Sequence, residues 1–285
     1  HQGEHYFIPA SNTKIITCYA AMKYLGDSLE GMRYTIKDDT TLQIQPTGDP
    51  TFLHPDFINQ PVAEFLKKFK LIKCFAFGPT KNKINYYGDG WSWNDYLDDY
   101  MVPTGDFPIA GNIAHFKFDP KIHTANISPK FFGKGFKNWL PHSSNIQGIK
   151  IYRSFDQNDF TMVEGNQHEI SIPFIPTLAA VEFILEDSLK VKVETDMYDW
   201  LAYNSVIYSQ PTDSLLKIMM HRSDNFFAEQ SLLMVSNKIL GTMNDEKIID
   251  TLLKTDFKEM PQQPKWVDGS GLSRYNLFSP QDFVF

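Results

Sequence analysis

The sequence has 285 residues, a mass of 32.9 kDa and a formal net charge of −7 at pH 7. Hydrophobic residues make up 42% and aromatic residues 14%, which is enough for a packed core and excludes a disordered chain. A mildly acidic chain lacks the basic surface that nucleic acid or an anionic membrane attracts, so we expect neither as a partner. Two cysteines, Cys18 and Cys74, exclude a disulfide scaffold and a cysteine-based zinc site.

The first predicted element is a helix over residues 15–25 that is apolar on nearly every side. Such a helix is normally central to its domain. Pro9 before it and Gly26 after it are typical start and stop signals.

A β-rich region follows from about residue 34 to 199, where short runs alternate apolar and polar residues between Gly, Pro, Asn and Asp. Its predicted strands cover residues 41–45, 83–87, 114–118, 149–155 and 169–174, and one helix covers 62–70. From residue 212 the helical period returns. It predicts helices over 215–220, 226–240 and 245–254. This order indicates a β-rich insertion into a helical parent domain. No apolar run reaches the ~20 residues of a membrane helix.

Ser11 and Lys14 carry the strongest local signal, in the run Pro-Ala-Ser-Asn-Thr-Lys at residues 9–14. Their spacing places both side chains on one face at the start of a helix. A serine hydroxyl becomes a nucleophile when a base takes its proton, and a lysine can be that base where burial lowers its pKa. The alternative is a serine N-cap beside a surface lysine, and Ser214 with Lys217 repeats the same spacing.

Ser223 and Asn225 lie between two predicted helices. On a tight turn a hydroxyl can pass a proton to a leaving amine, and an amide can hold a substrate carbonyl. The alternative is an ordinary turn and N-cap. Ser143-Ser144-Asn145 repeats the pattern in a loop where we expect only a turn.

A glycine-rich run, Asp-Gly-Ser-Gly-Leu-Ser-Arg, covers residues 268–274. Two glycines around Ser270 allow the backbone to approach a ligand closely, and Arg274 can bind a carboxylate through two parallel hydrogen bonds.

Other kinds of site have little support. The eight histidines are scattered and no glycine-rich phosphate loop occurs, so we expect no metal and no cofactor. Carboxylates that can in principle form an acidic pair for sugar hydrolysis are Asp49, Asp95, Asp98 and Asp99. Their spacing does not favour that site over solvated loops.

Together these stretches resemble one family. Ser-x-x-Lys and Ser-Asp-Asn belong to the signature of penicillin-binding proteins and class A β-lactamases. Ser11 and Ser223 are 212 positions apart, which exceeds the separation in a β-lactamase. The pattern is similar to the D-alanyl-D-alanine carboxypeptidase/endopeptidase family, the class C low-molecular-mass penicillin-binding proteins. Further stretches that agree are Gly48-Asp49-Pro50-Thr51, residues 90–95, Asp224-Asn225 with Ala228-Glu229, and residues 268–280.

The resemblance implies an α+β fold. Residues 1–35 and 201–285 would form a penicillin-binding, β-lactamase-like transpeptidase domain, in which helices pack on an antiparallel sheet. Residues 36–200 would form a large β-rich insertion of one or two domains, between the Ser-x-x-Lys and Ser-x-Asn motifs.

The resemblance also implies a serine DD-peptidase that hydrolyses D-Ala-D-Ala in peptidoglycan stem peptides, with D-Ala–diamino acid cross-links as a second candidate substrate. Ser11 would form the acyl-enzyme, with its backbone N–H as half of the oxyanion hole. Lys14 would take its proton, and Ser223 would relay a proton to the leaving amine beside Asn225. β-Lactams would be covalent inhibitors. Positions that match the family's substrate-binding residues near the diamino-acid side chain are Asp95, Tyr100 and Arg274.

The ends of the chain differ from the family. The chain starts at His1 and ends at Phe285 without Lys-Thr-Gly, so we expect a fragment that lacks part of the sheet and of the catalytic site. The substrate implies export to the periplasm. Two alternatives stay open: a non-catalytic peptidoglycan-binding relative, and a penicillin-recognising esterase or D-aminopeptidase. The sequence predicts no oligomeric state.

Overall fold

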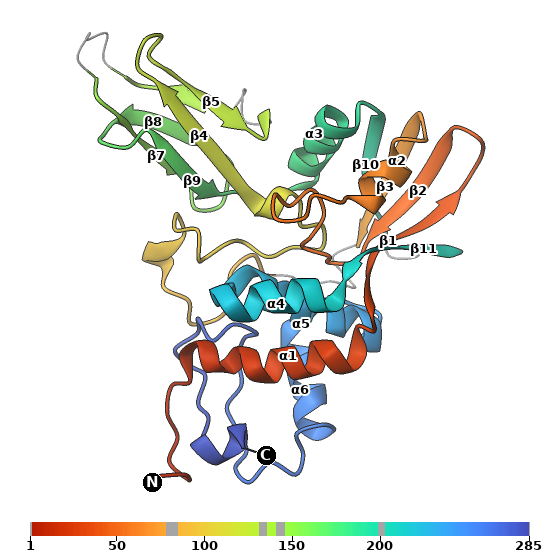
Figure 1. The fold of residues 1–285 in the computed structure, drawn as a ribbon, viewed down its shortest axis with the longest axis vertical. Helices are drawn as coiled ribbons and strands as arrows, with labels where there is room; N and C mark the ends of the chain where they lie inside the picture. The colour runs from red at the N-terminus through yellow and green to blue at the C-terminus, as the bar shows by residue number, and fades with distance from the viewer. Residues whose placement is uncertain (1, 78–84, 131–135, 141–145, 199–202, 285) are drawn as a thin grey trace.

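The computed structural model describes residues 2–77, 85–130, 136–140, 146–198 and 203–284. Figure 1 shows a helical part, which contains both ends of the chain at the bottom of the view, and a sheet-rich part at the top. The sheet-rich part is formed by the middle of the sequence, so the predicted order of helix, β-rich region and helices is confirmed. The domain boundaries at residues 35 and 201 stay a prediction.

The helical part contains α1 (Thr13–Tyr24), α4 (Thr212–Arg222), α5 (Asn225–Leu240) and α6 (Asp245–Lys254). α5 is buried along most of its length and contacts α1, α4 and α6. It is therefore the central helix. α1 is buried on one side only, because Ile15, Tyr19 and Met22 are 44%, 48% and 65% exposed. The expectation of a fully surrounded helix at α1 is thus wrong, although the helix itself is confirmed.

A five-stranded sheet lies next to the helical part, with the order β10-β3-β2-β1-β11. Its strands are β1 (Ser28–Ile36), β2 (Thr41–Pro46), β3 (Leu71–Phe77), β10 (Lys192–Tyr198) and β11 (Ser205–Pro211). β3 runs parallel to β2 and β10, whereas the other pairs are antiparallel. Parallel neighbours need a crossover, and helices α2 (Pro61–Leu66) and α3 (Leu178–Leu189) lie in the connections that precede β3 and β10.

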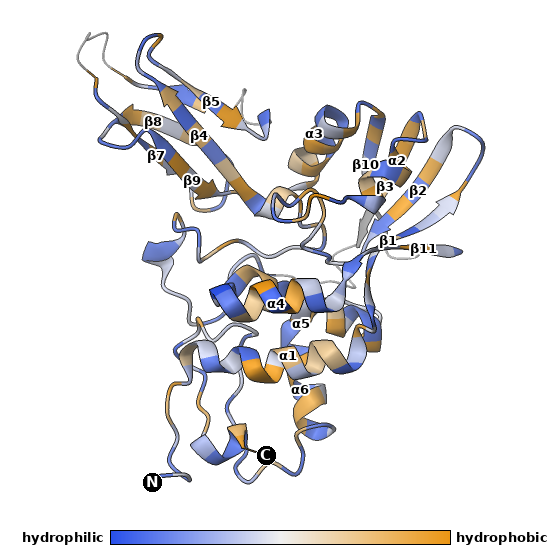
Figure 2. Cartoon of the chain, viewed as in Figure 1, coloured by the Kyte–Doolittle hydropathy of each residue, from blue (hydrophilic) through white to orange (hydrophobic). Residues whose placement is uncertain are grey.

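Two three-stranded sheets form the rest of the insertion (Figure 1). One contains β5 (Thr124–Ser128), β4 (Ile113–Asp119) and β9 (Glu169–Pro173), and the other contains β6 (Phe136–Asn138), β8 (Phe160–Glu164) and β7 (Ile149–Arg153). Buried and exposed residues alternate along β4 and β7, as Figure 2 shows for the hydropathy of β4. This alternation gives each sheet one core-facing side.

Some sequence predictions differ from the structure. The predicted helix 62–70 ends at Leu66, and the predicted strand 149–155 ends at Arg153. Residues 83–84 of the predicted strand 83–87 lie outside the described residues, and residues 85–87 form no strand. In the described residues of the helical part, strand pairing is limited to isolated bridges, such as Phe7 with Phe278.

Candidate active site

Ser11 and Lys14 meet at the start of α1. Ser11 lies in the short 3-10 helix η1 (Ala10–Asn12), which leads into α1, and Lys14 lies in the first turn of α1. Lys14 Nζ lies 3.4 Å from Ser11 Oγ. Lys14 is only 1% exposed, so it is not the surface lysine of the alternative interpretation.

Two acceptors hold the buried amine of Lys14. Its Nζ donates to Asn225 Oδ1 at 2.6 Å and to the backbone carbonyl of Ser270 at 2.8 Å. Burial lowers the pKa of Lys14, because desolvation disfavours the ammonium, and the nearby carboxylates, led by Glu229, oppose this effect only in part. The lowered pKa enlarges the neutral fraction that can accept a proton.

Ser223 lies on the turn between α4 and α5. It adopts a left-handed conformation with φ 57° and ends α4. In this position its Oγ donates to Ser11 Oγ at 2.7 Å. The neighbouring Asp224 caps α5 by accepting from the backbone N–H of Phe227 at 2.9 Å. The turn-and-cap interpretation therefore applies to Asp224, whereas the Ser223 hydroxyl points at Ser11.

Asn225 links the amine of Lys14 to the backbone of Tyr100, which lies across the cleft. Its Oδ1 accepts from Lys14, and its Nδ2 donates to the backbone carbonyl of Tyr100 at 2.9 Å. Both ends of the amide are thus in use, which fixes its orientation.

The glycine-rich run forms a tight turn against η1. Gly271 has φ 83°, and a Cβ there would lie 1.8 Å from the carbonyl oxygen of Ala10, so no side chain fits. Asp268 organises the turn. Its carboxylate accepts from the backbone N–H groups of Gly271 and Ser273 at 2.8 and 2.6 Å, and from Asn276 Nδ2 at 2.7 Å.

Glu229 of α5 is a part of the site to which the sequence analysis gave no role. Its carboxylate accepts from the backbone N–H groups of Gly269 and Ser270 at 2.9 and 2.8 Å. Complete burial, reinforced by the charge of Asp268, raises the pKa of Glu229. These bonds fix the peptide whose Ser270 carbonyl binds Lys14. The sequence signal for this position is the match of Ala228-Glu229 to the family, which gave Glu229 no role.

A cleft of about 780 Å³ opens above Ser11. Of the predicted site residues, those that line it are Ser11, Asp95, Tyr100, Asn225 and Arg274. Lys14 and Ser223 do not line the cleft and reach it through their contacts with Ser11. Desolvation, followed by the hydrogen bond and charge of Asp95, raises the pKa of Tyr100 to about 12, so the phenol stays protonated at neutral pH. Arg274 is exposed at the cleft.

The repeated Ser-x-x-Lys motif, Ser214 with Lys217, does not form a second site. Lys217 is exposed on α4, and no hydrogen bond between it and Ser214 occurs. Ser143-Ser144-Asn145 lies outside the described residues. Asp49 is buried and accepts from the backbone and hydroxyl of Thr51, so it stabilises a turn.

Two other kinds of site are absent from the part of the chain that the structure describes. There, no cluster of three or more His, Cys, Asp or Glu side chains can hold a metal ion. In the same residues, no helix has the length and hydropathy needed to cross a membrane.

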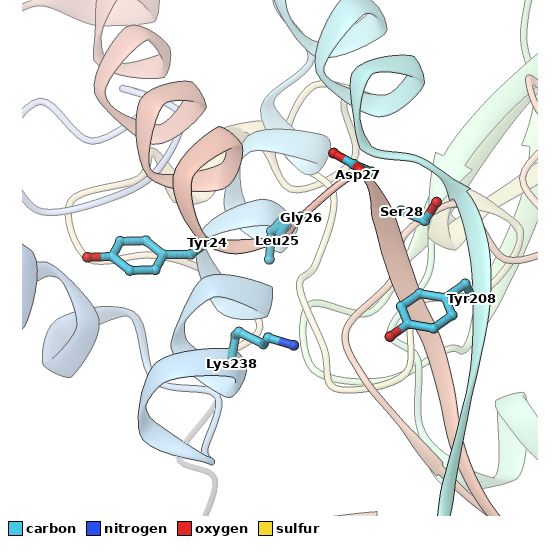
Figure 3. A pocket seen from close by; sticks show the side chains of 7 residues that line it. All are labelled: Tyr24, Leu25, Gly26, Asp27, Ser28, Tyr208 and Lys238. Carbon is cyan, nitrogen blue, oxygen red and sulfur yellow. The ribbon is translucent and has the colours of Figure 1, made fainter.

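A second pocket of about 420 Å³ lies between the end of α1, β1, β11 and α5 (Figure 3). It is lined by Tyr24, Leu25, Gly26, Asp27, Ser28, Tyr208 and Lys238. The Lys238 ammonium forms an ion pair with Glu30. None of the predicted site residues lines this pocket, so the candidate site is the cleft at Ser11.

Comparison with known proteins identifies a family. The sequence profile of the D-Ala-D-Ala carboxypeptidase 3 (S13) family matches residues 1–284. The chain belongs to this family. It is therefore a peptidase of the serine D-Ala-D-Ala carboxypeptidase type, which confirms the resemblance inferred from the motifs. No curated protein matches the chain by sequence.

Solved structures support the fold. The chain is similar to penicillin binding protein 4 from Haemophilus influenzae, with a TM-score of 0.73 and 20% identity over 100% of this chain and 70% of that one. A second structure of that protein, complexed with a novel β-lactam, gives a TM-score of 0.67 and 20% identity over 99% and 68% of the two chains. At this identity the likeness shows a shared fold, so the predicted fold class is confirmed.

Proposed function

We propose that Ser11 is the nucleophile of a DD-peptidase that acts on peptidoglycan stem peptides ending in D-Ala-D-Ala. One observation carries the proposal. The Oγ of Ser11 contacts both the buried amine of Lys14, at 3.4 Å, and the hydroxyl of Ser223, at 2.7 Å. A nucleophile with one proton acceptor and one proton relay is the arrangement that acyl transfer requires.

The proposed reaction has two halves. Neutral Lys14 takes the proton of Ser11 while Ser11 Oγ attacks the carbonyl of the penultimate D-Ala, and the backbone N–H of Ser11 stabilises the oxyanion. The C–N bond then breaks, and the proton passes from Lys14 through Ser223 to the leaving amine of the terminal D-Ala. Water hydrolyses the acyl-enzyme and regenerates Ser11. The short Lys14–Asn225 contact keeps the amine in place during both halves.

The rest of the cleft suits the substrate's diamino-acid side chain. Asp95 offers a carboxylate to its amino group, Arg274 offers a guanidinium to its carboxylate, and protonated Tyr100 offers a hydroxyl. In a cross-link the D-Ala carbonyl of one stem peptide is bonded to the side-chain amine of a diamino acid in another, so we propose endopeptidase action beside carboxypeptidase action. The substrate places the protein in the periplasm, and β-lactams, which mimic the D-Ala-D-Ala bond, are the expected covalent inhibitors.

The test is release of D-Ala from a stem pentapeptide, compared among the wild type, Ser11→Ala and Ser214→Ala. We expect release by the wild type and Ser214→Ala, and none by Ser11→Ala. Release by Ser11→Ala would contradict the assignment of the nucleophile. Acylation by a β-lactam without release of D-Ala would favour the esterase or D-aminopeptidase alternative, and neither reaction would favour the binding relative.

A further inference from the structure

Residues 85–104, here called the cleft segment, form one wall of the candidate site. Gly90, Ser92, Asp95 and Tyr100 of this segment line the cleft. Its ends are held together because Thr104 donates its backbone N–H to the carbonyl of Tyr86 and its hydroxyl to the carbonyl of Asn85, both at 2.9 Å. The segment is therefore a loop whose two ends lie side by side, and its side chains line the cleft.

Two contacts tie the cleft segment to the catalytic part of the molecule. Trp91 Nε1 donates to Asp268 Oδ2 at 2.9 Å, and the Tyr100 carbonyl accepts from Asn225 at 2.9 Å. Neither contact reaches the short 3-10 helix η2 (Trp93–Asp95), which carries Asp95. Asp95 bonds to Ser92, Asp98 and Tyr100 of the same segment, so its position also depends on contacts that hold the segment from outside.

Arg153, the last residue of β7, supplies such a contact from the inserted sheets. It is only 2% exposed, although its side chain is a cation. Its Nη2 donates to the Tyr87 hydroxyl at 2.6 Å and to the backbone carbonyl of Tyr96 at 3.4 Å. In return the Tyr96 hydroxyl donates to the carbonyl of Arg153 at 2.9 Å, and the guanidinium lies 5.4 Å from the Tyr96 ring centroid.

The second terminal nitrogen of the guanidinium, Nη1, binds the loop of residues 154–157 that follows β7. Nη1 donates to the backbone carbonyls of Ser154, Phe155 and Gln157. The Phe155 ring then stacks on Tyr87 at 5.1 Å and meets Tyr96 edge-on at 5.4 Å. Arg153 forms no salt bridge within the described ranges. Among the described residues, Nη1 and Nη2 have acceptors, whereas the buried Nε has none. A buried cation without a counter-ion is costly, and the bonds of Nη1 and Nη2 to these two loops offset part of that cost.

We propose that Arg153 is a positioning residue that holds the cleft segment, and through Tyr96 its neighbour Asp95, in the geometry that binds the substrate's diamino-acid side chain. This inference rests on the proposed function. Asp95 lies in the binding cleft and outside the Ser11–Lys14–Ser223 cluster, so Arg153 acts on substrate binding more than on the chemical step. Binding that is equal in the ground state and the transition state appears in KM and leaves kcat unchanged.

The test compares Arg153→Met, Arg153→Lys and Tyr87→Phe with the wild type and with Lys150→Met. Lys150 is an exposed cation on the same strand, so its variant is the matched control. Substrates are a stem pentapeptide with its diamino acid and the same peptide with alanine in that place. We expect Arg153→Met to raise KM for the first peptide by roughly 10-fold to 100-fold. We expect kcat, KM for the alanine peptide and the rate of acylation by benzylpenicillin to stay within about threefold.

The milder variants separate positioning from folding. Tyr87→Phe removes one hydrogen bond to the guanidinium and leaves the β7 loop bonds intact, so we expect a smaller rise in KM of about threefold to tenfold. Arg153→Lys restores the charge without the planar fork and should rescue only in part. Equal losses with both peptides, or an unchanged KM in Arg153→Met, would overturn the proposal.

Hydrogen exchange gives a second readout that needs no activity. Arg153→Met should speed amide exchange in residues 86–100 and leave α5 protected as in Lys150→Met. Unchanged exchange in residues 86–100 would overturn the positioning role. If the wild type neither hydrolyses the peptide nor reacts with benzylpenicillin, the proposed function fails, and exchange alone decides whether Arg153 holds the cleft segment.

Discussion

At the residue scale, the site depends on a lysine kept out of water. Lys14 is buried, its pKa is lowered by that burial, and its amine is aimed at Ser11 by Asn225 and Ser270. Burial lowers the pKa of the amine but does not orient it toward Ser11. The two acceptors fix its direction, so protonation state and geometry have separate causes.

Replacing Lys14 with methionine tests the proposed base. Methionine keeps the apolar stem but cannot accept a proton, and it leaves Asn225 Oδ1 and the Ser270 carbonyl without their donor. We expect the rate of acylation of Ser11 to fall by about 10²- to 10⁴-fold. The matched control is Lys217→Met in the repeated motif, which should acylate at the wild-type rate. A Lys14→Met protein that is folded and fully active would contradict the assignment.

The pH dependence of acylation tests the electrostatics. Lys14 must be neutral to act, so the rate should rise with pH through the lowered pKa of Lys14. Asp224 raises that pKa by its charge, so Asp224→Asn should lower it further and move the rising limb to lower pH. Asparagine also caps helices, which preserves α5.

The measurement is the acylation rate by benzylpenicillin against pH. Asp250→Asn is the control, because Asp250 pairs with Lys254 on the exposed face of α6. A rising limb of the rate–pH profile that moves to higher pH in Asp224→Asn, or that moves equally in both variants, would refute the proposed effect of Asp224 on the pKa of Lys14.

At the scale of elements, the close approach of the glycine turn to η1 requires Gly271. An added Cβ would lie 1.8 Å from the Ala10 carbonyl, and φ is 83°. We expect Gly271→Ala to lower the free energy of unfolding by roughly 3 kcal/mol or more. Gly241 also has a positive φ, 66°, but has no atom within 4 Å of an added Cβ. Gly241→Ala should therefore cost only about 1 kcal/mol. Urea unfolding measures both, and equal costs would contradict the steric explanation.

The helices with long, regular apolar patterns could be predicted from the sequence. The predictions for α5 and α6 agree with the structure to within one residue. The sequence analysis predicts no helix at α3, where Pro173 and Pro176 come shortly before an apolar run. In the structure Pro173 is the last residue of β9, Pro176 lies between β9 and α3, and Thr177 caps the helix that follows. Proline therefore marks the boundary between β9 and α3.

The site was predictable where its chemistry is local in sequence. Ser11 with Lys14, and Ser223 with Asn225, are short motifs on helix starts and turns. The Ser270 carbonyl, Glu229 and Arg153 act through contacts that depend on tertiary packing. The Lys14–Ser270 bond alone joins residues 256 positions apart. No local pattern specifies such a contact, so these roles could not be predicted from one sequence.

At the scale of the whole molecule, α5 links the catalytic part to the insertion through Gln230. This buried amide donates to the carbonyls of Gly48 and Gly105 at 2.8 and 3.0 Å and accepts from the Gly105 N–H at 3.0 Å. One side chain thereby holds two loops of the inserted part against α5. The arrangement lets the insertion set the shape of the site without supplying the nucleophile.

Removing these bonds should cost stability. Gln230→Leu leaves up to three buried backbone groups unpaired, at about 1–3 kcal/mol each, so we expect a loss of roughly 3 kcal/mol or more in the free energy of unfolding. Gln263→Leu, at an exposed position, should stay within about 0.5 kcal/mol of the wild type. Urea unfolding measures both variants, and a Gln230→Leu protein as stable as the control would contradict this role of α5.

Ser11 is the proposed nucleophile, activated by Lys14 and Ser223. The most direct measurement is the intact mass of the protein after incubation with benzylpenicillin, with peptide mapping and with Ser11→Ala as the control. We expect the mass of the wild type alone to increase by that of one penicillin, and the adduct to lie on the peptide that contains Ser11. A folded wild-type protein without an adduct, or an adduct that persists in Ser11→Ala, would contradict it.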